Sequence, residues 1–317
     1  MPPRLLTQAA RWRPWEIAVW IVLAASPFAA GAHAALINEI AIFALFALSL
    51  DLILGYAGIV SLGHTAYFGA GAYAAALFAK HVMPDPLAGL AVGVAAGAVL
   101  GLLTSPMIVR GSDLTRLMVT MGIALVLLEL ANKFDHITGG VDGMQGLVIG
   151  PLLGRFEFDL GGRVAACYSL LVLFIVFVLL RRIVHSPLGV SMQALRDNRL
   201  RLAALGASVN ARLAVVYTVG AALAGAAGAL LTQTTGFVSL DVLEFHRSAD
   251  VMLALVIGGT GWLWGGPIGA IAFKLMHDLL SAVTTQYWTF WIGLFLVVLM
   301  LVGRERLLRP WTWGRRA

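Results

Sequence analysis

Long apolar segments recur along the whole chain, and they constrain its fold more than any other feature. A helix that crosses the hydrocarbon layer of a membrane needs about 20 mostly apolar residues. Ten segments of roughly this length follow one another in the sequence: 15–33, 36–54, 59–79, 87–109, 114–132, 163–184, 211–232, 249–264, 266–283 and 286–303. They predict an all-α fold, a polytopic membrane helix bundle of about ten spans, with eight as the lower bound.

Composition excludes the main alternatives to a membrane protein. Hydrophobic residues make up 60% of the 317 residues and charged residues 12%, whereas soluble domains carry roughly 25% charged residues. A soluble protein this apolar could not cover its surface with polar groups. The formal net charge of +6 does not indicate nucleic-acid binding, because the charges lie between the apolar segments and at the chain ends. We therefore expect a lipid bilayer as the surroundings and no nucleic acid as a partner.

The basic residues predict the orientation in the membrane. Loops that face the cytoplasm carry most of the lysine and arginine in membrane proteins. With the N-terminus inside, the inner loops and tails hold 16 of the 22 basic residues. The outer loops then hold only Lys80, Lys133, Arg155, Arg163 and Arg247. We expect an even number of spans and cytoplasmic tails at 1–14 and 304–317, on either side of a membrane domain at 15–303.

Two parts of this topology have open alternatives. Arg11-Trp12-Arg13 precedes an apolar run that ends in Ala32-His33-Ala34, a pattern that also fits a cleavable signal peptide, although the run is longer than usual. The eighth and ninth segments are separated by the glycine-rich stretch 258–267. Because clustered glycine interrupts membrane helices, these two segments could be a hairpin, two half-helices or a re-entrant element.

The sequence contains no residue pattern that predicts catalysis. No zinc-binding H-E-x-x-H, serine-nucleophile G-x-S-x-G or phosphate-binding G-x-x-x-x-G-K-[ST] occurs. The single cysteine, Cys167, allows neither an intramolecular disulfide nor a thiolate metal site. We expect no enzyme activity, no metal and no cofactor in this chain. If its work consumes ATP, another subunit binds and hydrolyses it.

The stretch 55–73 carries glycines at positions 55, 58, 63, 69 and 71, with Ser61, His64 and Tyr67 among them. Paired glycine-interrupted segments in the two halves of a chain are the best sequence indication of a transport site, and polar groups at membrane depth usually face the protein interior or a solute path. We predict a substrate path lined by Ser61, Gly63, His64, Tyr67, Gly258 and Gly259. The alternative is tight helix packing, with His64 in an inter-helix hydrogen bond.

Four motifs in order give the chain a family resemblance. They are G-Y-A-G-x-x-S-L-G-H-x-A-x-F-G-x-G-A-Y over 55–73, T-G-G-V-D-G over 138–143, the loop 189–206 and the glycine-rich stretch 249–270. Together they resemble the permease subunits of ABC importers for branched-chain amino acids, in particular the LivM type. The stretch 112–123 departs from the family pattern, because it lacks the usual aromatic run, and Arg199 stands where a glutamate is common.

The loop at about 185–210 reads as an amphipathic cytoplasmic helix. Ser186 suits an N-cap with Pro187 at the first helical position, and Gly206 suits the C′ position. Met192, Leu195, Leu202 and Leu205 form one apolar stripe. The family resemblance favours a coupling helix that docks on an ATPase through Leu195, Arg196, Asp197, Leu202, Leu205 and Gly206. A helix lying on anionic lipid is the alternative.

The resemblance also implies partners and a location. They are a second homologous permease chain, two cytoplasmic ATP-binding subunits and an external solute-binding protein, in a bacterial plasma (inner) membrane. The solute implied is a branched-chain or other small amino acid, with urea, short amides and aromatic acids as alternatives. A self-sufficient secondary transporter or channel also fits the apolar bundle. Charged residues in or beside predicted spans are either paired within the bundle or part of a path; they are Asp51, Glu129, Asp250 and Lys274.

Overall fold

The computed structural model describes residues 13–29, 31–159 and 161–283, with a few further positions between 290 and 297. These residues form helices and no β-strand. The α-helices are α2 (Pro14–Ala29), α3 (Ala34–Asp51), α4 (Thr65–His81), α5 (Pro86–Val109), α6 (Asp113–Lys133), α7 (Asp135–Thr138), α8 (Arg163–Val184), α9 (Pro187–Asp197), α10 (Arg199–Ala204), α11 (Val209–Thr235), α12 (Phe245–Gly258) and α13 (Gly265–Val283). The predicted tenth segment, 286–303, and the two predicted tails lie largely or wholly outside the described residues.

The short elements complete this order. A π-helical turn, η2 (Leu52–Tyr56), continues α3. Three 3₁₀ turns are η1 (Gly31–His33), η3 (Gly140–Asp142) and η4 (Leu240–Leu243). The start of α5 follows ordinary capping chemistry: the Asp85 carboxylate accepts a hydrogen bond from the Leu87 N–H at 2.9 Å, with Pro86 in the first helical position.

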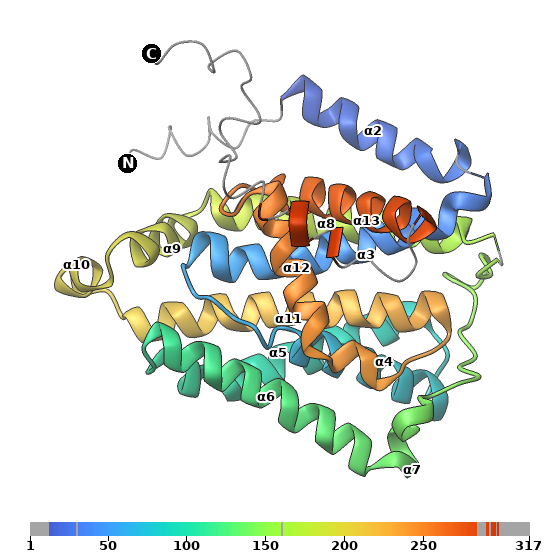
Figure 1. Cartoon of the computed structure of the whole chain (residues 1–317), viewed down its shortest axis with the longest axis horizontal. Helices are drawn as coiled ribbons and strands as arrows, with labels where there is room; N and C mark the ends of the chain where they lie inside the picture. The colour runs from blue at the N-terminus through green and yellow to red at the C-terminus, as the bar shows by residue number, and fades with distance from the viewer. Residues whose placement is uncertain are drawn as a thin grey trace.

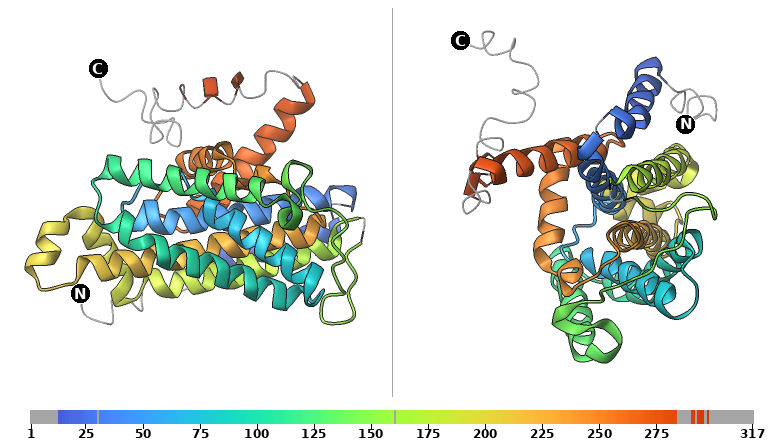
Figure 2. Two further views of the ribbon diagram at one scale, coloured as in Figure 1. Left: turned by 90° about the horizontal axis from the view of Figure 1, so that it is seen from below. Right: turned by 90° about the vertical axis from the view of Figure 1, so that its right-hand side faces the viewer.

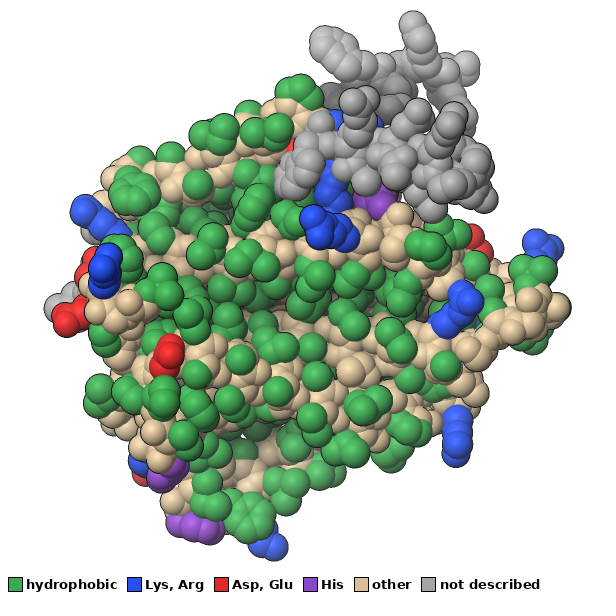
Figure 3. All heavy atoms as spheres, turned by 180° about the vertical axis from the view of Figure 1, so that it is seen from behind, with side chains coloured by type: hydrophobic (Ala, Val, Ile, Leu, Met, Phe, Trp, Pro, Cys, Tyr) green, Lys and Arg blue, Asp and Glu red, His purple; other side chains and the backbone are tan. Residues whose placement is uncertain are grey.

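Five of the described helices are long and apolar enough to cross a membrane. They cover Ala34–Tyr56, Pro86–Val109, Asp113–Lys133, Arg163–Val184 and Val209–Thr235, and α2 is a shorter apolar helix. The face in Figure 3 presents a broad band of hydrophobic side chains, with most of the charged side chains toward its two ends. The chain is a multi-pass membrane protein, as its composition predicts.

The long helices run side by side around α11. In Figure 1, α3, α5, α8 and α11 lie roughly parallel, with α9 and α10 at one end of the bundle and α7 at the other; we call these the α9 end and the α7 end. The right-hand view of Figure 2 looks along the bundle and shows α12 and α13 crossing the parallel helices. The predicted eighth and ninth segments are thus two helices, α12 and α13, joined by the loop 259–264.

Small residues allow α5 and α11 to approach closely. Glycines at positions 89, 93, 97 and 101 repeat at every fourth residue of α5, and all four face α11. A Cβ at Gly97 would overlap the backbone carbonyl of Ala221, and a Cβ at Gly93 would lie 2.6 Å from the Ala229 Cβ. Close backbone contact of this kind replaces the hydrophobic driving force that lipid does not supply between helices. The α5–α11 pair is therefore a tightly packed part of the core.

Gly97→Ala should lower the thermal stability of the purified chain in detergent. The added methyl group has no room beside Ala221, so the two helices must move apart, and overpacking of this kind costs about 1–3 kcal/mol. The matched control is Gly122→Ala on α6, where nothing lies within 4 Å of the new Cβ. Equal unfolding midpoints for the two variants would show that α5 and α11 are not in contact at Gly97.

Candidate functional site

The first glycine-rich segment is interrupted, as its composition predicts. The helix stops after η2, residues 57–64 are not helical, and α4 begins only at Thr65, six residues later than the predicted segment start at 59. Gly58 has φ of +69°, which an L side chain rarely adopts. Gly63 lies so close to α6 that a Cβ would overlap the Thr120 carbonyl. We call residues 57–64 the first break.

The polar side chains of this segment lie inside the bundle. Ser61 is 1% exposed and His64 is fully buried. The His64 Nε2 lies 2.8 Å from the Ser49 Oγ of α3, and its ring stacks on Phe46 at 5.4 Å between centroids. The inter-helix hydrogen bond that the sequence left as an alternative is therefore present. Contact of Ser61, Gly63 or His64 with a solute stays a prediction.

Tyr67 joins three helices through its hydroxyl group. That group lies 2.8 Å from the Thr104 Oγ1 of α5 and donates to the Tyr217 hydroxyl of α11 at 3.1 Å. Tyr67 and Tyr217 are almost completely buried. Because buried hydroxyl groups are costly without partners, this network fixes α4 against α5 and α11. A role of Tyr67 in a path stays a prediction.

The second break, residues 259–264, separates α12 from α13. Gly259 and Gly261 have φ of +95° and +76°, so both positions favour glycine. Gly258 packs against the start of α13, where its Cβ would overlap the Gly265 carbonyl. The break ends at Trp264, which is buried and donates from Nε1 to the Glu16 carboxylate at 3.2 Å.

Both breaks meet helix α9 at one point. The Asp51 Oδ1, at the end of α3, accepts a hydrogen bond from the Gly261 N–H at 2.8 Å. The guanidinium of Arg196, near the end of α9, donates to the Gly55 carbonyl. A Cβ at Gly58 would lie 3.0 Å from the Arg196 Cγ. We call this meeting of Asp51, Gly55, Arg196 and Gly261 the junction.

The predicted coupling helix is correct in its caps and wrong in its continuity. Ser186 accepts from the Leu188 N–H at 3.2 Å, and Gly206 has φ of +79° just after the helical end at Leu205. The segment is nevertheless two helices, α9 and α10. Asn198 has extended backbone angles, and its side chain caps α10 by accepting from the Arg201 N–H at 3.0 Å. Asparagine readily ends a helix in this way.

The predicted apolar stripe divides between two surroundings. Met192, Leu195 and Leu202 are buried in the chain's own core, with Leu195 fully buried. Leu205 is 83% exposed, as is Leu200. Leu195 therefore cannot be part of a docking surface. The most exposed apolar side chains of this segment are Leu200 of α10 and Leu205 just after it, close to exposed Asp197.

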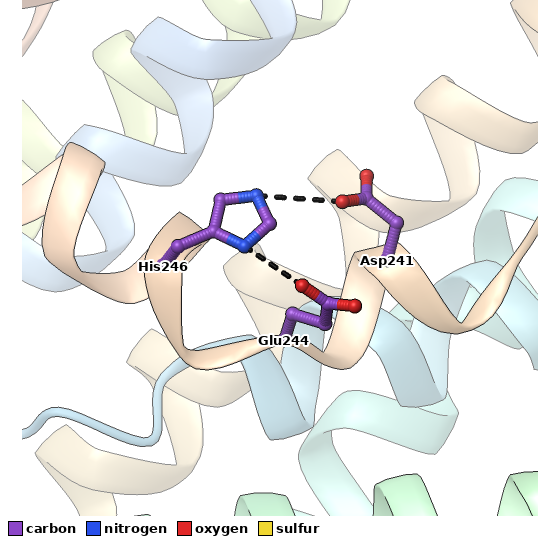
Figure 4. Close-up of side chains that lie close together, drawn as sticks. All are labelled: Asp241, Glu244 and His246. Atoms are coloured by element: carbon purple, nitrogen blue, oxygen red, sulfur yellow. Dashed lines mark ion pairs between the residues drawn. The ribbon is translucent and has the colours of Figure 1, made fainter. Parts of the chain in front are cut away.

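An ion-paired cluster lies at the start of α12. Asp241, Glu244 and His246 place one possible metal-ligand atom each within 4.8 Å of one another (Figure 4). His246 Nδ1 lies 2.9 Å from Glu244, and the Arg247 guanidinium pairs with Asp241. These pairs satisfy the cluster with the chain's own groups. We assign its role to fixing the first turn of α12.

A cavity toward the α7 end contains two of the charged residues that the sequence marked. Asp250 and Lys274 line it together with phenylalanines of α3, α4 and α13. Asp51 belongs instead to the junction, and Glu129 is exposed on α6. The phenylalanines gave no sequence signal, because an apolar side chain in a span is equally consistent with lipid, core or a cavity wall.

Comparison with known proteins decides the family. The model of the family described as "Branched-chain amino acid transport system / permease component" matches residues 32–303. The chain belongs to this family. The resemblance found in the sequence motifs is thereby confirmed.

Individual relatives agree with this assignment. The chain is 29% identical over 298 residues to the high-affinity branched-chain amino acid transport system permease protein LivM of Escherichia coli, with 86% of this chain and 68% of LivM covered. It is 26% identical over 118 residues to LivH of the same organism, with 37% and 38% covered. It is 29% identical over 261 residues to the autoinducer 2 import system permease protein LsrC of an Enterobacter strain, with 78% and 71% covered. No solved structure matches the chain significantly.

Proposed function

We propose that this chain is one of two permease subunits of an ATP-driven importer in a bacterial plasma membrane. Its α9 end faces the cytoplasm, both termini lie there, and the α7 end faces outward. Two such chains enclose the solute path, two cytoplasmic subunits bind and hydrolyse ATP, and an external binding protein delivers the solute. No cofactor resides in this chain. LivM and LivH are both named as permease proteins of one transport system, which favours pairing with a second, LivH-like chain.

The observation that carries this proposal is the contact of Arg196 with Gly55 at the junction. An importer of this kind needs a cytoplasmic element that can alter the membrane helices when the ATPases move. Helix α9 contacts the first break at Gly58, and Asp51, at the end of α3, holds the second break through Gly261. A small displacement of α9 therefore acts on the two least regular parts of the bundle at once. Such breaks serve as hinges because few residues must change their backbone angles.

The solute we propose is a branched-chain or other small amino acid. The family description and the LivM relatives support it. The LsrC relative, named for import of autoinducer 2, indicates that overall similarity alone does not determine the solute. Urea, short amides and aromatic acids therefore remain the alternatives that a transport assay must include.

Leu205→Asp should reduce the amount of ATP-binding subunit that co-purifies with the permease at least about ten-fold, because it adds a charge at the proposed apolar contact. The chain should still insert, since Leu205 is exposed. Leu195→Asp should instead remove the chain from the membrane, because Leu195 is fully buried in the core.

The matched control is Val148→Asp, which adds the same charge to an exposed residue in the loop between α7 and α8. Its co-purification should equal that of the wild type. If Leu205→Asp binds the ATPase subunits as well as Val148→Asp does, α10 is not the docking element.

A further inference from the structure

A cavity of about 410 Å³ lies between α3, α12 and α13, with α4 and α11 completing its wall. Its lining includes Glu39 near the start of α3, Thr235 at the end of α11 and His246 at the start of α12. The cavity therefore lies toward the α7 end, away from the junction. Its size and mixed lining are typical of small-molecule sites.

One side of the cavity is aromatic. Phe43 and Phe273 stack with their centroids 5.4 Å apart, and Phe46 and Phe68 lie 4.7 Å apart. These four rings come from α3, α4 and α13 and all line the cavity. They offer an apolar surface for an aliphatic or aromatic side chain and no hydrogen-bonding group.

The other side carries balanced charge. Lys274 pairs with Glu39 at 3.2 Å, and Arg247 pairs with Asp241. Within the described part of the chain, no hydrogen bond or ion pair holds the Asp250 carboxylate, although His246, Lys274, His277 and Arg247 lie close enough to interact with it electrostatically. Two acidic and two basic groups, Glu39 and Asp250 against Lys274 and Arg247, line one small space.

We infer that this cavity binds a zwitterionic α-amino acid with an apolar side chain. Asp250 binds the ammonium group, Lys274 binds the carboxylate, and the four phenylalanines hold the side chain. The two charges of an α-amino acid are separated by one carbon, so their partners must be neighbours, as Asp250 and Lys274 are. An aromatic acid would leave Asp250 without a cation, and urea would leave the aromatic wall uncovered.

The position of the cavity explains how a bound solute could affect the two breaks. Phe46, in the wall, stacks on His64 at the end of the first break. Asp250 lies on α12, which ends at the second break. A solute between Phe46 and Asp250 therefore lies against α3, which packs on His64, and against α12, which leads into the second break. The inference rests on the proposed function, of which it names the solute site.

The test measures binding of labelled leucine, up to millimolar concentration, to the complete permease–ATPase complex in nanodiscs without the binding protein. Competition by 4-methylpentanoate, which lacks the ammonium group, and by 3-methylbutan-1-amine, which lacks the carboxylate, is measured alongside. Asp250→Asn should weaken leucine binding at least about ten-fold and leave the affinity for 4-methylpentanoate unchanged. Lys274→Met should weaken leucine binding similarly and leave the affinity for the amine unchanged.

Glu129→Gln serves as the control, because it removes a carboxylate that is exposed on α6 outside the cavity. Equal losses for leucine and for both analogues in the Asp250 and Lys274 variants would assign these residues a structural role and overturn the inference. The inference would also be overturned if the wild-type complex imported leucine with ATP but bound no leucine in the nanodisc assay. Absence of any ATP-driven import by the wild-type complex would instead count against the proposed function itself.

Discussion

Arg196→Ala is expected to reduce ATP-driven uptake at least about ten-fold while ATP hydrolysis by the complex continues. Arg196 provides the hydrogen bond from α9 to the Gly55 carbonyl, at the point where the Asp51 side chain holds Gly261. Without the guanidinium, the Gly55 carbonyl loses a charged donor, a loss of about 1–3 kcal/mol. Movement of α9 then no longer displaces the two breaks, so ATP hydrolysis continues without solute uptake.

The control for this variant is Arg182→Ala, which removes the same charge from an exposed position near the end of α8. Asp51→Asn should retain more activity than Asp51→Ala, because asparagine can still accept the hydrogen bond from the Gly261 N–H. Uptake and hydrolysis are measured on the same proteoliposomes. If Arg196→Ala behaves like Arg182→Ala, the junction does not couple the ATPases to the path.

The helices and their interruptions were predictable because they depend on local sequence. Apolar length located the five described helices that are long enough to cross a membrane, and glycines at 58, 259 and 261 marked the breaks, where the structure has positive φ. Ser186 and Gly206 marked the ends of the segment that forms α9 and α10 for equally local reasons: a side-chain acceptor and a left-handed position.

The surroundings of each helix face were not predictable. In a membrane protein an apolar side chain can face lipid, the core, a partner or a cavity, and hydrophobicity does not distinguish these. Leu195 and Leu205 lie on one predicted stripe, yet one is fully buried and the other 83% exposed. The difference arises because Asn198 ends α9 and redirects the chain, and a helical wheel drawn through 186–206 cannot show this.

Charged residues indicated structurally specific positions better than hydrophobicity did. Charged groups are rare at membrane depth and usually functional or paired, and three of the four residues marked on this ground are in structurally specific places. Asp51 holds the second break, and Asp250 and Lys274 line the cavity. Only the tertiary structure shows that Asp51 lies beside Arg196 and Gly261, and that Asp250 and Lys274 lie beside the phenylalanines. No spacing in the sequence brings residues 51, 196 and 261 together.

The account's central claim is that this chain transports only as half of an ATP-driven permease. Its helix breaks are contacted by α9, and its described residues leave the apolar side chains of Leu200 and Leu205 exposed beside that helix. In such a chain, the conformational change at the two breaks is driven by other subunits that move α9. Uptake should therefore depend completely on the other subunits, an all-or-none effect larger than that of any single substitution.

The most direct measurement is uptake of labelled leucine into proteoliposomes. One set contains this chain alone, a second contains it with the partner permease and the ATP-binding subunits, and the binding protein is supplied outside both. We predict leucine accumulation only in the second set, only with ATP on the side of the ATP-binding subunits. Leucine uptake by the chain alone, driven by an ion or solute gradient and indifferent to ATP, would contradict the account.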